Sequence, residues 1–244
     1  MHSSLLYWLA PAAALAILLG GWLVVRFLRG RASLMRHISG VAAGYLISVS
    51  IIRILPESLE KGESMAYWVL GGFLLVNLIE HGISPHFHYG EETHTHESTG
   101  VAGILALVGL SLHSFMDGMA ISAAISANGE LGTLVFFGIL LHRIPEGGTI
   151  SSIFLVRGFK DRGALLAAGT LALAACLGAL SQAFLRLQVG PVLGLAAGLG
   201  LYVGSSDLLP EAQKEKGWKS TLGLLAGTLL FLMTSVLVHH SHGS

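Results

Sequence analysis

One short motif, His-x-x-x-acid-Gly, occurs twice in the sequence. The first copy contains His113 and Asp117, and the second contains His142 and Glu146. Residues four apart on a helix lie one turn apart on the same face, so each copy presents an imidazole beside a carboxylate. Imidazole and carboxylate together suit zinc, iron, manganese and related divalent ions. If the two helical faces meet, these four residues are the predicted ligands of a metal site.

The composition places these polar residues in a hydrocarbon environment. Of the 244 residues, 53% are hydrophobic and only 11% are charged, whereas a soluble domain carries about 25% charged residues. One charged side chain in mid-membrane costs roughly 2.5–3.5 kcal/mol, so Asp117, Arg143 and Glu146 together cost on the order of 8 kcal/mol. The alternative is that they only hold helices together, but Ser or Thr would do so at lower cost. We therefore interpret them as an ion-handling site.

The apolar stretches of the chain predict the elements that must carry the motifs. A membrane-spanning helix needs roughly 20 apolar residues. Eight stretches qualify: 5–28, 37–57, 65–83, 99–127, 131–156, 163–187, 189–210 and 219–240. We predict an all-α polytopic membrane protein of eight transmembrane helices, with residues 1–244 as a single transporter domain. The first stretch has no cleavage signal after it, so it is interpreted as a retained helix.

Lysine and arginine predict the orientation in the membrane. With eight spans, ten of the fourteen Lys and Arg residues fall on one side and two on the other. The positive-inside rule then puts both termini outside and loop 84–98 in the cytoplasm. We expect a bacterial inner membrane location, with lipid and divalent ions as partners. The formal net charge of zero gives no indication of a nucleic-acid partner. The ten residues lie within 26–36, 157–162 and 214–219.

A four-residue echo links the second and seventh predicted helices. Residues 54–57 read Ile-Leu-Pro-Glu and residues 208–211 read Leu-Leu-Pro-Glu, in helices predicted to run in opposite directions. Inverted repeats are typical of secondary transporters, although so short an echo could arise by chance. Glu57 and Glu211 are entrance and exit candidates, with ordinary interfacial carboxylates as the alternative. Asp207, one turn before Glu211, is a further exit candidate.

Other polar residues are weaker candidates. Glu80 ends the third predicted helix, where an interfacial position is the alternative, and Gln182 lies in the sixth, where helix packing is the alternative. Loop 84–98 is rich in histidine, and such tracts bind metal. It could capture metal in the cytoplasm, with a solvated linker as the alternative. Its candidate ligands are His86, His88, His94 and His96.

The paired motifs, the histidine-rich loop and the eight-helix layout with external termini resemble the ZIP (Zrt/Irt-like) metal transporters over essentially the whole chain. The resemblance implies a 3+2+3 bundle, in which the first and last three helices are related by inverted symmetry. It also implies transport of a divalent metal toward the cytoplasm, by one helix group sliding against another. The matching ligands would be His113, Asp117, His142 and Glu146. Zinc is the expected metal, with cadmium, iron and manganese open, and a homodimer is compatible with such a glycine-rich bundle.

The motifs depart from the family pattern at two positions. Many members carry Asn after the first motif histidine and a metal-binding acid or Asn after the second, whereas this chain has Ser114 and Arg143. A guanidinium is always charged and cannot coordinate a cation. We predict that Arg143 takes the place of a second ion and pairs with Asp117 or Glu146, which leaves a mononuclear site. The alternative is that Arg143 snorkels away from the site.

Two other functions fit part of the pattern. An intramembrane metal-dependent hydrolase could use the site to activate water, but the sequence has no His-Glu-x-x-His pair. A cation exporter could use a related ligand set, but such proteins more often have six spans and a soluble domain. We therefore expect a transporter and not an enzyme. Because imidazole must be neutral to bind metal, binding should weaken as the pH falls through roughly 6.5.

Overall fold

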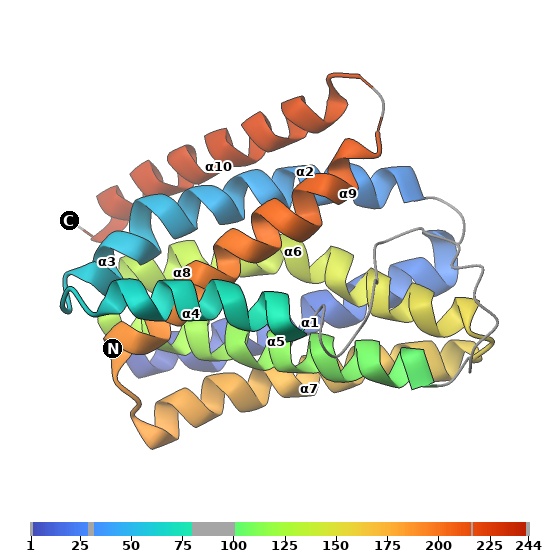
Figure 1. The fold of residues 1–244 in the computed structure, drawn as a ribbon, viewed down its shortest axis with the longest axis horizontal. Helices are drawn as coiled ribbons and strands as arrows, with labels where there is room; N and C mark the ends of the chain where they lie inside the picture. The colour runs from blue at the N-terminus through green and yellow to red at the C-terminus, as the bar shows by residue number, and fades with distance from the viewer. Residues whose placement is uncertain (1, 29–31, 80–100, 216, 243–244) are drawn as a thin grey trace.

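The computed structural model describes residues 2–28, 32–79, 101–215 and 217–242, and these residues form helices and turns without a strand. They make up eight long helical segments that run along the length of the molecule (Figure 1). This confirms the all-α prediction. The elements are α1 (His2–Leu23) with the π-helical turn η1 (Val24–Leu28), α2 (Ala32–Val49) with η2 (Ser50–Ile54) and α3 (Leu55–Leu59), α4 (Met65–Leu78), α5 (Val101–Ala127), α6 (Gly129–Val156), α7 (Asp161–Leu185), α8 (Val189–Tyr202) with η4 (Val203–Leu208) and α9 (Leu209–Gln213), and α10 (Lys219–His242).

The helices have the length and surface of a polytopic membrane protein. Among the described residues, six segments are long and apolar enough to cross a bilayer, namely those of α1, α2, α5, α7, α8 and α10. Helix α4 is apolar but has 14 described residues. Helix α6 has 28 residues, but His142, Arg143 and Glu146 interrupt its apolar run. That all eight segments cross the membrane therefore stays a prediction.

The outside of the bundle is covered by large apolar side chains. Leu166 and Phe184 of α7 are 72% and 80% exposed, and Leu229 and Met233 of α10 are 60% and 63% exposed. Soluble monomers rarely expose contiguous apolar patches of more than a few hundred Å². These faces are therefore suited to lipid.

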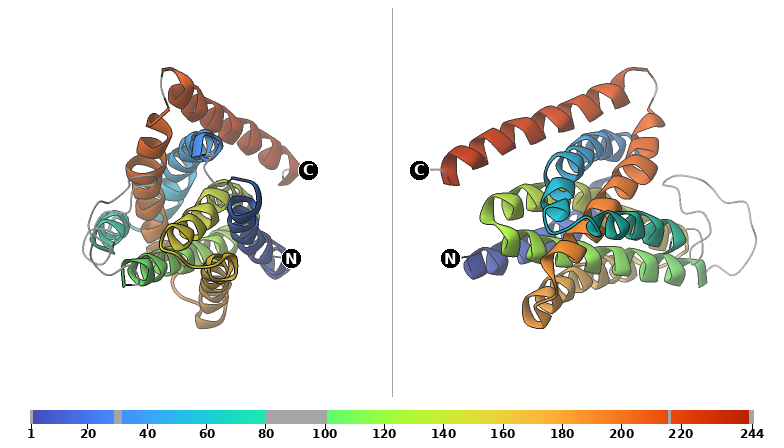
Figure 2. Two further views of the ribbon diagram at one scale, coloured as in Figure 1. Left: turned by 90° about the vertical axis from the view of Figure 1, so that its right-hand side faces the viewer. Right: turned by 60° about the vertical axis from the view of Figure 1, so that its left-hand side comes forward.

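The helices divide into two groups. The motif group, which carries both motifs, contains α1, α5, α6 and α7, and the flanking group contains α2, α4, α8 and α10 with their short extensions. Contacts between the groups run mainly from α6 to α2 and from α5 to α8. The end-on view in Figure 2 shows the two groups side by side. A metal site between α5 and α6 thus belongs to one group and faces the other.

Glycines bring helix backbones into direct contact within each group. A Cβ atom at Gly20, Gly72, Gly118 or Gly198 would lie within about 2.2 Å of a carbonyl oxygen on the adjacent helix of the same group. Small residues allow this approach in membrane bundles. Between the groups, by contrast, Gly138 of α6 meets side-chain atoms on α2. The tightest contacts therefore hold each group together.

The Leu-Pro-Glu echo is also present in the structure. In both copies a long helix widens into a π-helical turn, η2 or η4, and then continues as a short helix that begins with Leu-Pro-Glu. Proline explains the turn, because Pro56 and Pro210 lack an N–H and their rings clash with the carbonyl four residues earlier. The two copies run in opposite directions (Figure 1), as the sequence predicts.

The two ends of the bundle differ in charge. We call the end with Arg36, Lys160 and Lys214 the basic end, and the end with Lys61 and Asn128 the far end. Helix α1 begins and α10 ends at the far end (Figure 1).

Candidate metal centre

The two motifs meet between α5 and α6. His113, Asp117, His142 and Glu146 each offer one ligand atom, and these atoms all lie within 4.8 Å of one another. Nε2 of His142 is 2.9 Å from Oδ2 of Asp117, and Nε2 of His113 is 3.3 Å from the same oxygen. All but His113 are buried. The structure thus brings together the four residues that the spacing predicts as ligands.

The glycine that ends each motif positions the acid before it. A Cβ at Gly118 would lie 2.0 Å from the carbonyl oxygen of Ala175 on α7. A Cβ at Gly147 would lie 1.9 Å from the carbonyl oxygen of Ile17 on α1. Each motif helix is therefore pressed against a neighbour at the level of its acid, which fixes the depth of the two carboxylates.

A backbone carbonyl orients His142. Its Nδ1 lies 3.1 Å from the carbonyl oxygen of Gly138, one turn earlier in α6. Since a carbonyl only accepts, Nδ1 carries the proton and donates it, and this fixes the ring with Nε2 directed at Asp117. Contacts of this kind commonly set the orientation of metal-binding histidines. Nε2 is therefore the atom that His142 can offer to a metal.

Arg143 turns into the site and contacts both acids. Its side chain is fully buried, and its Nη1 donates to Oε2 of Glu146 at 2.7 Å. Its Nη2 lies 3.4 Å from Oδ2 of Asp117. The guanidinium is therefore placed between the two carboxylates, and in this geometry it does not snorkel away from them.

Ser114 completes this arrangement. Its hydroxyl accepts from Nη1 of Arg143 at 2.8 Å and donates to Oε1 of Glu146 at 2.5 Å. Its carbonyl oxygen accepts from Nη2 of Arg143 at 3.1 Å. Ser114 thus holds the guanidinium and the glutamate together. The two residues that depart from the family pattern, Ser114 on α5 and Arg143 on α6, therefore contact each other.

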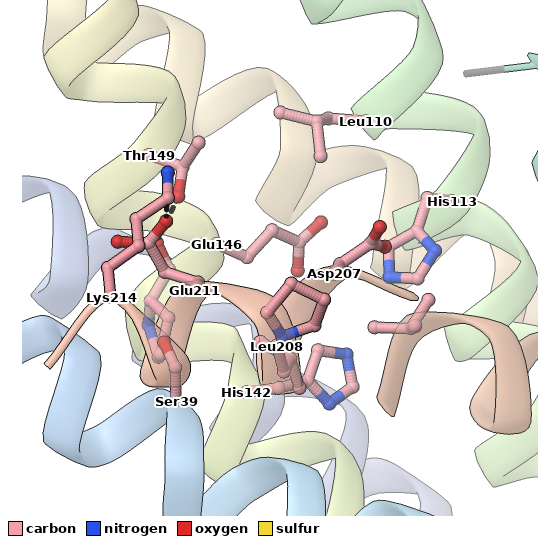
Figure 3. Close-up of a pocket in the computed structure, with 13 residues that line it drawn as sticks. Ser39, Leu110, His113, His142, Glu146, Thr149, Asp207, Leu208, Glu211 and Lys214 are labelled. Carbon is pink, nitrogen blue, oxygen red and sulfur yellow. Dashed lines mark hydrogen bonds and ion pairs between the residues drawn. The ribbon is translucent and has the colours of Figure 1, made fainter. Parts of the chain in front are cut away.

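An open cavity connects three of the four residues, His113, His142 and Glu146, with the basic end. Its volume is about 140 Å³, and Figure 3 shows His113, His142 and Glu146 at one part of its wall. Asp207 and Glu211 of the flanking group line another part. The cavity therefore lies between the two helix groups.

The route from Asp117 to the far end is closed. The cavity on this side has a volume of about 10 Å³, and apart from Asp117 its walls are apolar residues of α2, η2, α5, α6 and α8. A single water molecule needs roughly 10–15 Å³, so a hydrated ion has no room. In this conformation the candidate site is accessible only from the basic end, as far as the described residues show.

The exit candidates lie along the open cavity. Glu211 is buried and has two cationic neighbours: Nε of Arg36 at 3.2 Å and Nζ of Lys214 at 2.9 Å. Asp207 faces the cavity from η4, one turn closer to the motif residues (Figure 3). Outside the spans, the pKa of Glu215 is held below its ordinary value, first by a hydrogen bond from Ser33. Glu211 and Glu215 thus lie among cationic side chains at the basic end.

The remaining candidates lie elsewhere. Glu57 is at the far end, where it pairs with Lys61 at 3.2 Å and accepts from Asn128 at 3.4 Å. The amide of Gln182 donates to the carbonyl of Leu187 at the end of α7. Glu80 and loop 84–98, with His86, His88, His94 and His96, lie outside the described residues.

Sequence reasoning missed the polar contacts at the far end. Arg53 pairs with Glu130, which is 77 residues away in the chain. The sequence around Glu130 indicates only a helix start, because Asn128 caps α6 by accepting from the backbone N–H of Leu131 at 2.7 Å. No local pattern predicts that this acid meets Arg53.

Comparison with known proteins gives one family. The profile of the ZIP zinc transporters matches residues 86–235. The zinc transporter ZupT of Enterobacter sp. strain 638 is 32% identical over 215 residues, which cover 82% of this chain and 83% of the relative. The zinc transporters ZupT of Escherichia coli O7:K1 and Shigella dysenteriae serotype 1 are 29% and 30% identical, and each alignment covers 93% of this chain and 94% of the relative.

Proposed function

Because the chain belongs to the ZIP zinc transporter family, we propose that His113, Asp117, His142 and Glu146 bind the transported ion, with zinc as the preferred metal. Membership in this family shows that the chain is an integral membrane protein that transports divalent metal. It also shows that the chain is not an enzyme, which removes the intramembrane hydrolase. The cation exporter is likewise not favoured by a match to this family.

The convergence of the four ligand atoms is the observation that carries the proposal. Two imidazoles and two carboxylates within 4.8 Å of one another, mostly buried, form a donor set of the kind that divalent transition metals prefer. Both imidazoles and the carboxylate of Glu146 line a cavity through which an ion can leave. This donor set admits zinc, cadmium, iron and manganese, and the names of the relatives favour zinc.

The open cavity supports a direction of transport. The positive-inside rule puts the basic end in the cytoplasm, so the described conformation would be open to the inside, with both termini outside. An ion bound between α5 and α6 would then be released into the cytoplasm of a bacterium, across its inner membrane. Residues 1–244 would act as a single transporter domain, with loop 84–98 receiving released metal. A homodimer remains a prediction.

Arg143 supports a mononuclear site. Asp117 and Glu146 contribute a charge of −2, and the guanidinium between them returns +1. One divalent ion brings the sum to +1, whereas a second would bring it to +3, which Coulomb repulsion in a poorly solvated site disfavours strongly. Arg143 would thus act as a tethered cation in the place of a second metal.

Zinc binding and uptake by the purified chain test the ligand set. We expect His142→Ala to weaken zinc binding in detergent by at least about tenfold to a hundredfold, the loss that even an outer-shell partner of a ligand causes, and to lower uptake into proteoliposomes in parallel. The matched control is His240→Ala, an exposed histidine of α10, which should change neither. In the unmodified chain, binding should weaken below about pH 6.5, where ordinary imidazoles become protonated.

Two results would contradict the proposal. One is zinc binding that does not change in His142→Ala or in Asp117→Ala. The other is two tightly bound zinc ions per chain at the membrane-embedded site, which would remove the mononuclear arrangement and leave the transport function intact.

A further inference from the structure

Polar contacts between the two helix groups gather at the far end. Glu130, in the first turn of α6, pairs with Arg53 of η2 and lies 3.3 Å from Nδ1 of His239 on α10. Beside it, Asn128 donates to Glu57 of α3 at 3.4 Å. In each contact one residue belongs to the motif group and the other to the flanking group. The contacts therefore pin the two groups together at this end.

The basic end has a different pattern. The ion pairs described there join Arg36 to Glu211, Arg36 to Glu215, and Lys214 to Glu211. All of these residues lie in or next to α2 and α9, within the flanking group. It is at this end that the cavity of about 140 Å³ separates the groups. At the far end, therefore, polar side chains join the two groups and the route to the site is closed.

The pair of Arg53 and Glu130 is placed where it can hold the far end shut. Their side chains are 30% and 17% exposed, so water and salt screen them less than a fully exposed pair. The acid is held in position because Asn128 caps α6, and the start of a helix stabilises a negative charge. Below the pair lies the small apolar cavity that reaches Asp117. Ile54, the neighbour of Arg53 in the chain, lines this cavity together with Asp117.

We propose that Arg53 and Glu130, supported by Asn128 and Glu57, form a latch between the two helix groups, and that this latch must open before metal can enter from the far end. The latch is defined as these four residues. It rests on the proposed function only for the direction of transport. The latch sets the fraction of molecules that are open at the far end, and hence the rate of uptake. Its residues do not contact the metal.

Access to a buried cysteine below the latch measures its opening directly. Ala120→Cys places a thiol in the small cavity next to Asp117, in a chain whose own Cys176 is replaced by Ser. The probe is a membrane-impermeant maleimide, added from the far end to proteoliposomes without metal. We expect Arg53→Gln or Glu130→Gln to raise the labelling rate roughly two- to fivefold, the population shift that the loss of one partly exposed ion pair produces.

Two further variants separate the latch from a general loss of structure. The double variant Arg53→Glu with Glu130→Arg restores the pair with its charges exchanged, and labelling should return to the slow rate. The matched control is Glu63→Gln, which removes the charge of an exposed acid in the turn between α3 and α4 at the same end, and should leave the rate unchanged. Zinc affinity in detergent, which depends on the motif residues, should be the same in all four.

The outcomes that overturn the latch are distinct from those that overturn the metal site. Single variants that label as slowly as the parent chain, or an exchanged pair that labels as fast as the single variants, would remove the latch. Neither result depends on whether His113 and His142 bind zinc. Conversely, loss of the ligand set in zinc-binding assays would leave the labelling pattern as it is.

Discussion

Residues 50–59 and 203–213 have the same local structure, but they lie in opposite surroundings. Both consist of a π-helical turn followed by a short helix that begins with Leu-Pro-Glu. The first borders a cavity of about 10 Å³, and the second borders one of about 140 Å³. The residue before the echo differs as well. Arg53 contacts the motif group through Glu130, whereas Asp207 faces the open cavity.

The two ends share a backbone turn but differ in which helix group supplies the partners of their charged side chains. Two copies with the same turn could in principle exchange their states, so that the far end opens while the basic end closes, as alternating access requires. In this structure one end is closed and the other open, and the ion pairs of the two copies differ accordingly. Glu211 is paired within its own group by Arg36 and Lys214, whereas Arg53 is paired across the groups.

The largest expected effect comes from breaking the rigidity of one group, on which the comparison depends. A Cβ at Gly178 would lie 1.8 Å from the carbonyl oxygen of Phe115, so Gly178→Leu should force α7 from α5. We expect a loss of about 3 kcal/mol of stability, the upper end of the usual cost of overpacking, seen as loss of monodisperse protein or a lower unfolding temperature in detergent. Gly169→Leu on the same helix is the control, since nothing lies within 4 Å of its added Cβ. Equal behaviour of the two variants would show that the close contact does not hold the group.

A smaller effect, on zinc affinity, is expected from a change in the charge of the candidate metal site. Arg143→Gln removes the cation between Asp117 and Glu146, so the local charge changes from −1 to −2. Zinc binding should become tighter by about tenfold, with a second ion bound at high concentration, as measured by titration calorimetry. The exposed Arg162→Gln is the control. Weaker binding with one ion per chain would mean that Arg143 serves the first ion and does not replace a second.

The smallest effect concerns Asp207, which precedes the second copy of the echo where Arg53 precedes the first. Asp207→Asn removes a carboxylate from the open cavity and leaves the four predicted ligands themselves unchanged. We expect uptake to slow by roughly two- to fivefold, as expected for one partly solvated charge, while zinc affinity in detergent stays the same. Ser205→Ala, an exposed position in the same turn, should have no effect. An unchanged uptake rate in Asp207→Asn would remove Asp207 from the exit route and weaken the contrast with Arg53.

Much of the fold follows from local sequence. The eight apolar stretches predict the eight helical segments to within a few residues at most described ends, because the bilayer sets their length. The two prolines of the echo also carry the signal for the π-helical turns, which the apolar stretches do not reveal. Residues 80–83, predicted as helix, lie outside the described residues. Local chemistry thus predicts where helices start, bend and end.

Helical spacing alone identifies the side chains that can bind a metal together. His113 and Asp117 share a helical face, as do His142 and Glu146, because their spacing matches one turn. That these two faces meet depends on the packing of α5 against α6, with Gly118 and Gly147 setting their depth against α7 and α1.

The structure alone also decided that Arg143 turns inward, that the basic end is open, and that Arg53 meets Glu130. The physical reason is that spacing along a helix fixes directions around its own axis. The partner of a charge 77 residues away, by contrast, depends on how the helices pack.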